Sequence, residues 1–370
     1  MADKRLIYPI YTNSQVARAG DAVRRGRITE HSEKVIENWR SSHNHVLNTW
    51  WVILFHRIQK LKISATPGQR LKRRNTIYDK LTNRPEMPGM SLRRMHDIAG
   101  CRVVFENEED LYYFRNSILI ESRFKHKYIK RQHKDYIAHP KESGYRGVHD
   151  VFAYKSDVGR PEKWNGLYVE IQYRTKFQHA WATAVEVADI LKKSRTKFSD
   201  KADEKQNIFF QYASEIIARV YEGRTSCFPD LSNEELVSGF ESVNKETQLL
   251  NLLRSVNHSK LHLKDKSKKA IILRLITNNL KVSVVTEGFN STSEAQSRLY
   301  ELEKEFPDDN IVLVKADNIN DIKNIFRNYF TDSKAFVTLI DKGLNFLNAG
   351  KQYVPNKQRA RRIQQMLPLD

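Results

Sequence analysis

A glycine-hinged loop followed by an alternating strand, within residues 134–174, constrains the fold more than any other part of the sequence. Pro140 fixes a backbone angle and withholds a hydrogen-bond donor, and Gly144 and Gly147 permit positive φ. A loop of this kind holds Tyr145, which lies between the two glycines, and the neighbouring cations out toward a ligand. The sequence therefore predicts a ligand-facing loop here.

Polar and apolar residues alternate from 167 to 174, as in a strand with one buried face. One face would carry Tyr168, Glu170, Gln172 and Arg174, and the other Val169, Ile171 and Tyr173. The polar face combines a carboxylate, an amide and a guanidinium in register, which suits a polar site. An ordinary solvent-facing strand shows the same alternation, so both interpretations stand at this point.

Composition and charge narrow the class of protein. The 370 residues suggest two domains, and 40% hydrophobic and 10% aromatic residues indicate a globular protein. The formal charge of +19 favours polyanionic partners such as nucleotides or nucleic acid. Cys101 and Cys227 are too few for a disulfide framework or a zinc cluster. No signal peptide and no apolar run of about 20 residues occurs, so we expect a cytoplasmic protein without membrane spans.

Apolar spacing predicts the elements of the larger part of the chain. We expect helices, with one or two in the first range, at 32–61, 108–120, 175–191, 207–221 and 233–256. Strands are expected at 95–105, 148–154 and 167–174. Seven Lys or Arg and no acid lie between His56 and Tyr78, and Pro67-Gly68 predicts a break in the chain before the densest part.

The pattern changes after a lysine-rich stretch at 258–269. Beyond it we expect a strand at 280–285, a helix at 291–306, a strand at 310–315 and a helix at 319–330. Parallel pairing of the two strands is the usual result of such a unit. The predicted organisation is an N-terminal basic segment, a main domain, a smaller α/β regulatory or neutralising domain and a basic tail, at 1–30, 31–256, 257–350 and 351–370.

Two acids are the candidates for chemistry. Asp97 precedes an apolar, β-branched run and so lies near a strand end, although turns and helix caps use aspartate too. The P-loop, the dinucleotide fingerprint, the kinase motifs and metal-spaced Cys or His clusters are absent from the sequence. Asp97, Glu170, many cations and one loop tyrosine are the equipment that phosphoryl transfer needs. A non-catalytic RNA-binding module remains the alternative from the residues alone.

Three separated blocks, at 97–102, 134–149 and 169–175, resemble the synthetase domain of the RelA/SpoT family, and the resemblance extends over about 35–220. The family implies an α+β fold with a mixed β-sheet flanked by helices, of the nucleotidyltransferase-like synthetase type. It also implies transfer of pyrophosphate from ATP to the 3′-hydroxyl of GTP or GDP, which makes the alarmone (p)ppGpp.

The resemblance assigns roles to individual residues. Asp97 matches the Mg²⁺ carboxylate, Glu170 the acid that assists Mg²⁺ and activates the 3′-hydroxyl, and Tyr145 the tyrosine that stacks on the acceptor guanine. ATP binding is implied for Arg70, Lys72 and Arg102. Contacts to the acceptor are implied for Lys134, Lys141, His149, Gln172 and Arg174.

Ser143 stands where many family members have Asn, and the chain has no room for the family's hydrolase domain. We therefore expect a standalone synthetase with a C-terminal extension. One alternative is a toxin that resembles other standalone members and pyrophosphorylates the 3′-CCA end of tRNA, restrained by its C-terminal domain until a protein trigger, such as a phage protein, releases it. The other is the non-catalytic RNA-binding module. The sequence predicts no oligomeric state.

Overall fold

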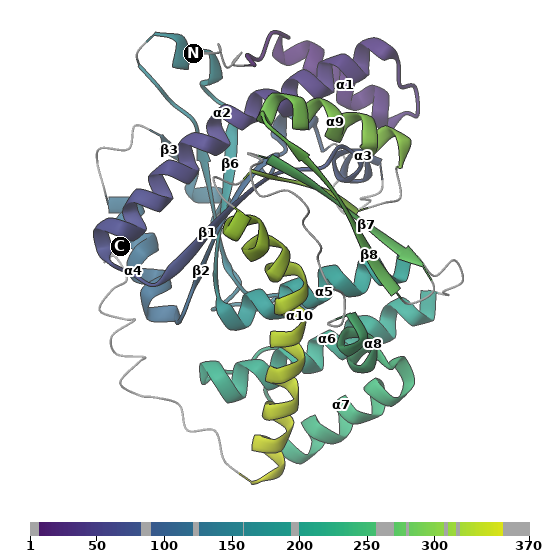
Figure 1. Ribbon diagram of the computed structural model, residues 1–370. Helices are drawn as coiled ribbons and strands as arrows, with labels where there is room; N and C mark the ends of the chain where they lie inside the picture. Colours follow the sequence, from purple (N-terminus) through teal and green to yellow (C-terminus); the bar gives the residue numbers. More distant parts are fainter. Residues whose placement is uncertain are drawn as a thin grey trace. The chain divides into compact units, whose positions relative to one another are not determined.

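The computed structural model describes residues 7–82, 90–120, 126–157, 159–193, 200–256, 270–278, 281–306, 310–315 and 319–350. The chain divides into two compact units. Figure 1 labels their helices and strands. The first holds the described residues as far as Ala138 and then Gly147–Thr175, and the second holds His139–Arg146 and the described residues from Lys176 onward. The predicted boundary at 258–269 and the basic tail at 351–370 lie outside the described residues.

The first unit is built on a six-stranded mixed sheet, which confirms the predicted fold class. Its strands are β1 (Ala65–Leu71), β2 (Ala99–Phe105), β3 (Lys127–Tyr128), β4 (Lys134–Asp135), β5 (Val148–Ala153) and β6 (Tyr168–Thr175). The order is β1-β2-β6-β5-β3, and β4 also pairs with β5. The β2–β6 pair is parallel and the other pairs are antiparallel.

Two helices cover one face of this sheet, which we call the core face: α2 (Glu30–Leu61) and α4 (Glu108–Ile120). Trp50 of α2 packs on Phe152 of β5 with ring centroids 4.4 Å apart, and Phe114 of α4 packs against Phe105 of β2 at 5.3 Å. Both helices were predicted, because their apolar residues recur at three- and four-residue steps. The opposite face, which we call the open face, carries the polar residues of β6.

Two features of the first unit differ from the sequence prediction. The helix α1 (Asn13–Arg24) lies in the segment that was expected to be basic and unpatterned, and it buries Val16 and Val23. The expected break at Pro67-Gly68 is wrong, because both residues lie inside β1. β1 is an edge strand, and an edge strand tolerates a proline because one side of its backbone needs no partner. The short helix α3 (Arg74–Thr82) follows β1.

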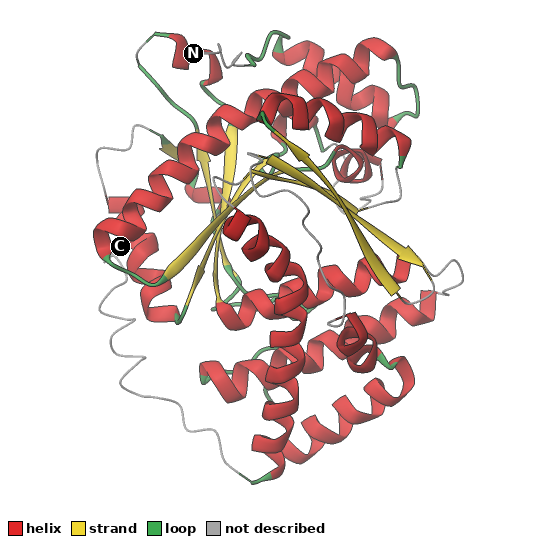
Figure 2. Ribbon diagram, in the orientation of Figure 1, coloured by secondary structure: helices red, strands yellow, loops and turns green. Residues whose placement is uncertain are grey.

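Helices dominate the second unit, as Figure 2 shows by colour. They are α5 (Lys176–Lys193), α6 (Asp200–Ile217), α7 (Asn233–Thr247), α8 (Leu249–Val256), α9 (Thr292–Glu305) and α10 (Ile319–Asn348), and a π-helical turn, η4 (Ala218–Glu222), extends α6. Phe209 and Phe210 of α6 pack with Phe240 of α7 and Phe336 of α10 in one core. The predicted helix at 233–256 is two helices, because Gln248 adopts the left-handed conformation with φ of 55°.

A second sheet in this unit has three strands, β7 (Ala270–Asn278), β8 (Lys281–Phe289) and β9 (Asn310–Lys315). Its order is β8-β7-β9, and both pairs are antiparallel. Parallel pairing of the two predicted strands is therefore wrong, because the unpredicted strand β7 lies between them. Leu299 and Leu302 of α9 pack against Ile272 and Ile311 of this sheet. No helix among the described residues is long and apolar enough to cross a membrane.

Candidate active site

Two carboxylates lie at neighbouring strands of the open face. Glu170 is in β6 and pairs in register with Gly100 of β2. Asp97 lies two residues before Ala99, where β2 begins. The two side chains are close enough that the negative charge of Asp97 acts to raise the pKa of Glu170. The parallel β2–β6 pair thus brings together the two acids that the sequence singled out.

Two lysines surround Asp97. The ammonium groups of Lys72 and Lys80 lie 2.6 Å and 2.5 Å from the same carboxylate oxygen, Oδ2. Burial alone would raise the pKa of Asp97, but the charges and hydrogen bonds of the two lysines outweigh it and hold that pKa well below its usual range. Burial lowers the pKa of Lys72 to about 8, and the charge of Asp97 opposes this shift.

Glu170 has different neighbours. The side-chain amide of Gln172 donates to its Oε1 at 2.6 Å, and Nδ1 of His149 lies 3.6 Å from the same oxygen. Burial would raise the pKa of Glu170, but the contacts with His149 and Gln172 lower it to about 2. Arg174 donates to the Gln172 carbonyl at 2.8 Å, so a chain of polar contacts runs along the strand to the carboxylate.

Strand register aligns four predicted residues in one row across the sheet. Lys134 of β4 pairs with His149 of β5, His149 pairs with Gln172 of β6, and Gln172 pairs with Arg102 of β2. Residues that face each other on adjacent strands project from the same side of a sheet. Cations and an imidazole therefore line the open face beside Glu170, and Arg70 of the edge strand β1 is exposed opposite Gly100 in the adjoining row.

The predicted loop tyrosine belongs to the second unit, together with Lys141. Nζ of Lys141 lies 5.3 Å from the centroid of the Tyr145 ring, and the Lys141 amide donates to the Tyr145 carbonyl at 3.2 Å. Gly144 has φ of +88°, and a Cβ there would lie 2.9 Å from Cβ of Ser214. The loop therefore requires glycine at this position.

A buried ion pair anchors this loop. Arg146 and Glu222, both almost fully buried, form an ion pair, and Gln178 donates to Glu222 at 2.9 Å. Glu222 is the last residue of the π-helical turn η4, a local geometry that often occurs at functional sites. The side chain that follows Tyr145 is thus fixed in the core of the second unit.

The structure gathers nine of the eleven predicted residues in the first unit, and Tyr145 and Lys141 belong to the second. It also places three residues near the acids that were not predicted. Lys80 contacts Asp97, and it lies just beyond the basic run that was counted to Tyr78. His96 and Tyr136 are close enough to Glu170 for its charge to affect their pKa values. His96 directly precedes Asp97 in the sequence, whereas no pattern in the sequence signals the proximity of Tyr136.

The acids fit a magnesium ion. The described residues contain no group of three or more His, Cys, Asp or Glu side chains arranged for a metal. Mg²⁺ usually takes one or two carboxylates and completes its shell with water and substrate phosphates. Asp97 and Glu170 supply oxygen ligands of this kind, and they lie close enough that the charge of Asp97 affects the pKa of Glu170.

Comparison with known proteins supports the family resemblance. The model of the family described as "Region found in RelA / SpoT proteins" matches residues 69–197. The GTP pyrophosphokinase YjbM of Bacillus subtilis is 34% identical over 153 residues, which are 41% of this chain and 66% of that protein. The rice protein named probable GTP diphosphokinase RSH3, chloroplastic, is 33% identical over 110 residues, which are 30% of this chain and 14% of that protein. The chain thus spans less than two thirds of the rice protein and 66% of the bacterial one.

Solved structures give related matches. The small alarmone synthetase 1 from Bacillus subtilis bound to its product pppGpp is 26% identical, with a TM-score of 0.40 over 48% of this chain and 88% of that chain. A GTP pyrophosphokinase family protein from Streptococcus pneumoniae is 20% identical, with a TM-score of 0.37 over 61% of this chain and 94% of that chain. By the family match, residues 69–197 are a RelA/SpoT region, which confirms the resemblance drawn from the three sequence blocks.

Proposed function

We propose that the protein transfers pyrophosphate from ATP to the 3′-hydroxyl of GTP or GDP. The observation that carries the proposal is the pair of carboxylates beside a row of cations within a RelA/SpoT region: Glu170 lies in β6, and Asp97 lies two residues before β2, the parallel neighbour of β6. The name of the relative YjbM, GTP pyrophosphokinase, supports a guanosine nucleotide as acceptor.

Glu170 is the proposed proton acceptor. Its pKa of about 2 keeps it ionised at neutral pH, so Oε1 or Oε2 can take the proton of the 3′-hydroxyl. The hydroxyl oxygen then bonds to the β-phosphorus of ATP, and the bond from this phosphorus to the bridging oxygen of the α-phosphate breaks. AMP leaves with the electron pair, and the pyrophosphoryl group remains on the acceptor.

Asp97 and Glu170 are the residues that would hold Mg²⁺, which, when bound, neutralises charge on the phosphate oxygens. Lys72 and Lys80 already balance Asp97, and their ammonium groups suit phosphate oxygens equally well. We assign Lys72 to ATP together with Arg70 and Arg102. Gln172 and Arg174 orient Glu170 through their chain of hydrogen bonds.

Acceptor binding is proposed for the other end of the row. Lys134 and His149 lie beyond Glu170 from the ATP-binding residues, as the register of β4, β5 and β6 shows. Tyr145 offers a ring for stacking on a base, and Lys141 adds a cation beside that ring.

The test is a product assay with the full chain, ATP and Mg²⁺, in which GDP, GTP and deacylated tRNA are offered separately. We expect AMP and a guanosine nucleotide with a 3′-pyrophosphate. Glu170→Gln should abolish the product, whereas Glu162→Gln, which changes an exposed glutamate of the turn η3 (Arg160–Trp164), should not. Product on tRNA alone, or no product from folded wild-type protein, would show that the proposal is wrong.

A further inference from the structure

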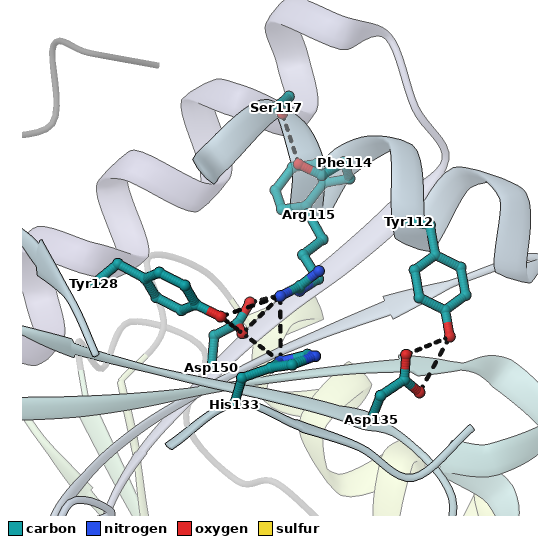
Figure 3. A network of polar contacts seen from close by, with 8 residues as sticks. All are labelled: Tyr112, Phe114, Arg115, Ser117, Tyr128, His133, Asp135 and Asp150. Carbon is teal, nitrogen blue, oxygen red and sulfur yellow. Dashed lines mark hydrogen bonds and ion pairs between the residues drawn. The ribbon is translucent and has the colours of Figure 1, made fainter. Parts of the chain in front are cut away.

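A buried carboxylate on the core face gathers partners from three other segments of the first unit (Figure 3). The Asp150 side chain of β5 is 0% exposed. Arg115 of α4 donates to it twice, from Nε to Oδ2 at 2.7 Å and from Nη2 to Oδ1 at 3.1 Å. The Tyr128 hydroxyl and Nδ1 of His133 lie 3.1 Å and 2.9 Å from Oδ1. Four donor contacts thus converge on one carboxylate.

Two residues of this network, Asp150 and His133, each adjoin in the sequence a residue that lies on the open face. Asp150 directly follows His149 in β5, and side chains of successive strand residues point to opposite faces. His133 directly precedes Lys134, which pairs with His149. The contact between His133 and Asp150 therefore holds together, from the core side, the two strands that present Lys134 and His149 on the open side.

A second anchor comes from the same helix. Figure 3 shows the Tyr112 hydroxyl directed at the Asp135 carboxylate. The hydroxyl lies 2.9 Å and 3.2 Å from the two carboxylate oxygens. Asp135 in turn accepts from the amides of Ile137 and Ala138 at 3.0 Å and 2.9 Å. Tyr112 and Arg115 are three positions apart, so they share one face of α4. That face holds the chain on both sides of Lys134.

The segment around Lys134 needs such anchors. β4 has only two residues, and few ladder hydrogen bonds fix so short a strand. Lys130, Arg131 and Lys134 are all exposed, so like charges repel one another along it. The carboxylates of Asp150 and Asp135 oppose this repulsion from the core side.

Tyr136, two residues after Lys134, links the anchored segment to the surroundings of Glu170. Its ring lies edge-on to His149 with centroids 5.5 Å apart, and the charge of Glu170 reaches it. The segment that α4 anchors therefore carries both a cation and an aromatic ring to the open face beside Glu170.

We propose that Tyr112, Arg115, His133 and Asp150 are positioning residues that fix Lys134 and Tyr136 for the acceptor nucleotide. The inference rests on the proposed function, because it takes Lys134 as an acceptor-binding residue. It predicts a selective effect: loss of an anchor weakens acceptor binding and leaves ATP binding unchanged.

The first experiment needs no substrate. Tyr112→Phe and His133→Leu each remove one polar group and leave the buried Arg115–Asp150 pair intact. We expect amide hydrogen exchange at residues 134–138 to rise about tenfold in both variants. Tyr113→Phe, at the exposed next residue of α4, and His56→Leu, at an exposed histidine of α2, are the matched controls and should leave it unchanged. Unchanged exchange in Tyr112→Phe and His133→Leu would overturn the inference.

The second experiment is kinetic. We expect His133→Leu to raise the KM for GDP or GTP by about tenfold and to leave the KM for ATP unchanged. His133→Asn, whose amide can still donate to Asp150, should have a KM for GDP or GTP close to that of the wild type. In a Lys134→Ala background, His133→Leu should raise this KM by clearly less than tenfold, because the part of its effect that acts through Lys134 is already lost. Multiplicative effects, or equal loss for both substrates, would contradict a positioning role. An inactive wild-type protein would instead refute the proposed function, and the exchange result would still decide whether the network fixes 134–138.

Discussion

Asp150 and Glu170 are carboxylates on adjacent strands that face opposite sides of one sheet, the first buried and the second partly exposed. Asp150 is 0% exposed and receives four donor contacts, two of them from one guanidinium. Glu170 is 18% exposed and has an amide at 2.6 Å and an imidazole at 3.6 Å. A carboxylate can accept about four hydrogen bonds, so Asp150 has no capacity left for a ligand and Glu170 retains some. The number and rigidity of the hydrogen-bond donors around each carboxylate, more than its burial, distinguish a structural acid such as Asp150, which we call the scaffold acid, from the proposed reactive acid, Glu170.

The largest expected effect concerns the reactive acid. Glu170→Gln removes the proposed proton acceptor while it keeps the size of the side chain, so we expect kcat for the guanosine product to fall by about 10³-fold, roughly 4 kcal/mol in the barrier. Steady-state product formation measures it, with Glu162→Gln as control. If Glu170→Gln retains most of the activity, another group accepts the proton, and Glu170 does not differ from Asp150 in the way proposed.

The scaffold acid should show the reverse behaviour. Asp150→Asn leaves the Arg115 guanidinium buried with no full counter-charge, so we expect the free energy of unfolding to fall by about 3 kcal/mol. Urea unfolding measures it, with Asp79→Asn on the exposed side of α3 as the control. A loss of stability no greater than that of the control would show that the buried network is dispensable.

The free energy of unfolding should depend on the ionisation of Glu170 at low pH. Its pKa falls from 4.5 in the unfolded chain to about 2 in the fold, so ionised Glu170 stabilises the protein above pH 4.5, and this stabilisation disappears as the pH drops toward 2. The stability difference between wild type and Glu170→Gln should therefore shrink by on the order of 2 kcal/mol between about pH 5 and pH 2. Urea unfolding of both proteins across this range measures it, and a constant difference would contradict the lowered pKa.

The smallest effect tests redundancy around the scaffold acid. Tyr128→Phe removes one of four donors to Asp150, so we expect a loss of about 1 kcal/mol in the free energy of unfolding. Thermal unfolding measures it beside Tyr113→Phe, which alters an exposed ring and should have no effect. A loss as large as that of Asp150→Asn would mean that the tyrosine, and not the arginine, dominates the network.

The sequence predicted those features that local patterns encode. The helix at 108–120 has the bounds expected from its apolar spacing, and 32–61 agrees with α2 within two residues at its start. The alternation in β6 holds as far as Tyr173, after which Arg174 is buried as well. Such patterns suffice because a helix stripe or a half-buried strand is defined within a few residues.

Features that depend on distant partners escaped prediction. Pro67-Gly68 has the composition of a turn, and only its place at the edge of the sheet makes it strand. Asp150 looked like an ordinary residue of a predicted strand, because its partner Arg115 is far away in the chain. Lys80 lies 17 residues before Asp97, and only the fold brings the two side chains into contact. The roles of the eleven site residues rest on the family resemblance and stay predictions.

The parallel pairing of β2 with β6 has a consequence for the order of folding. β5 and β6 are neighbours in the sequence and form an antiparallel pair. The parallel partner of β2 is β6, which is synthesised only after α4, β3, β4 and β5. Closing such a long loop costs entropy before any contact repays it, so nonlocal pairing is slow. A growing chain thus exposes most of the basic residues of the open face before Asp97 and Glu170 come together, so the proposed active site forms late in folding.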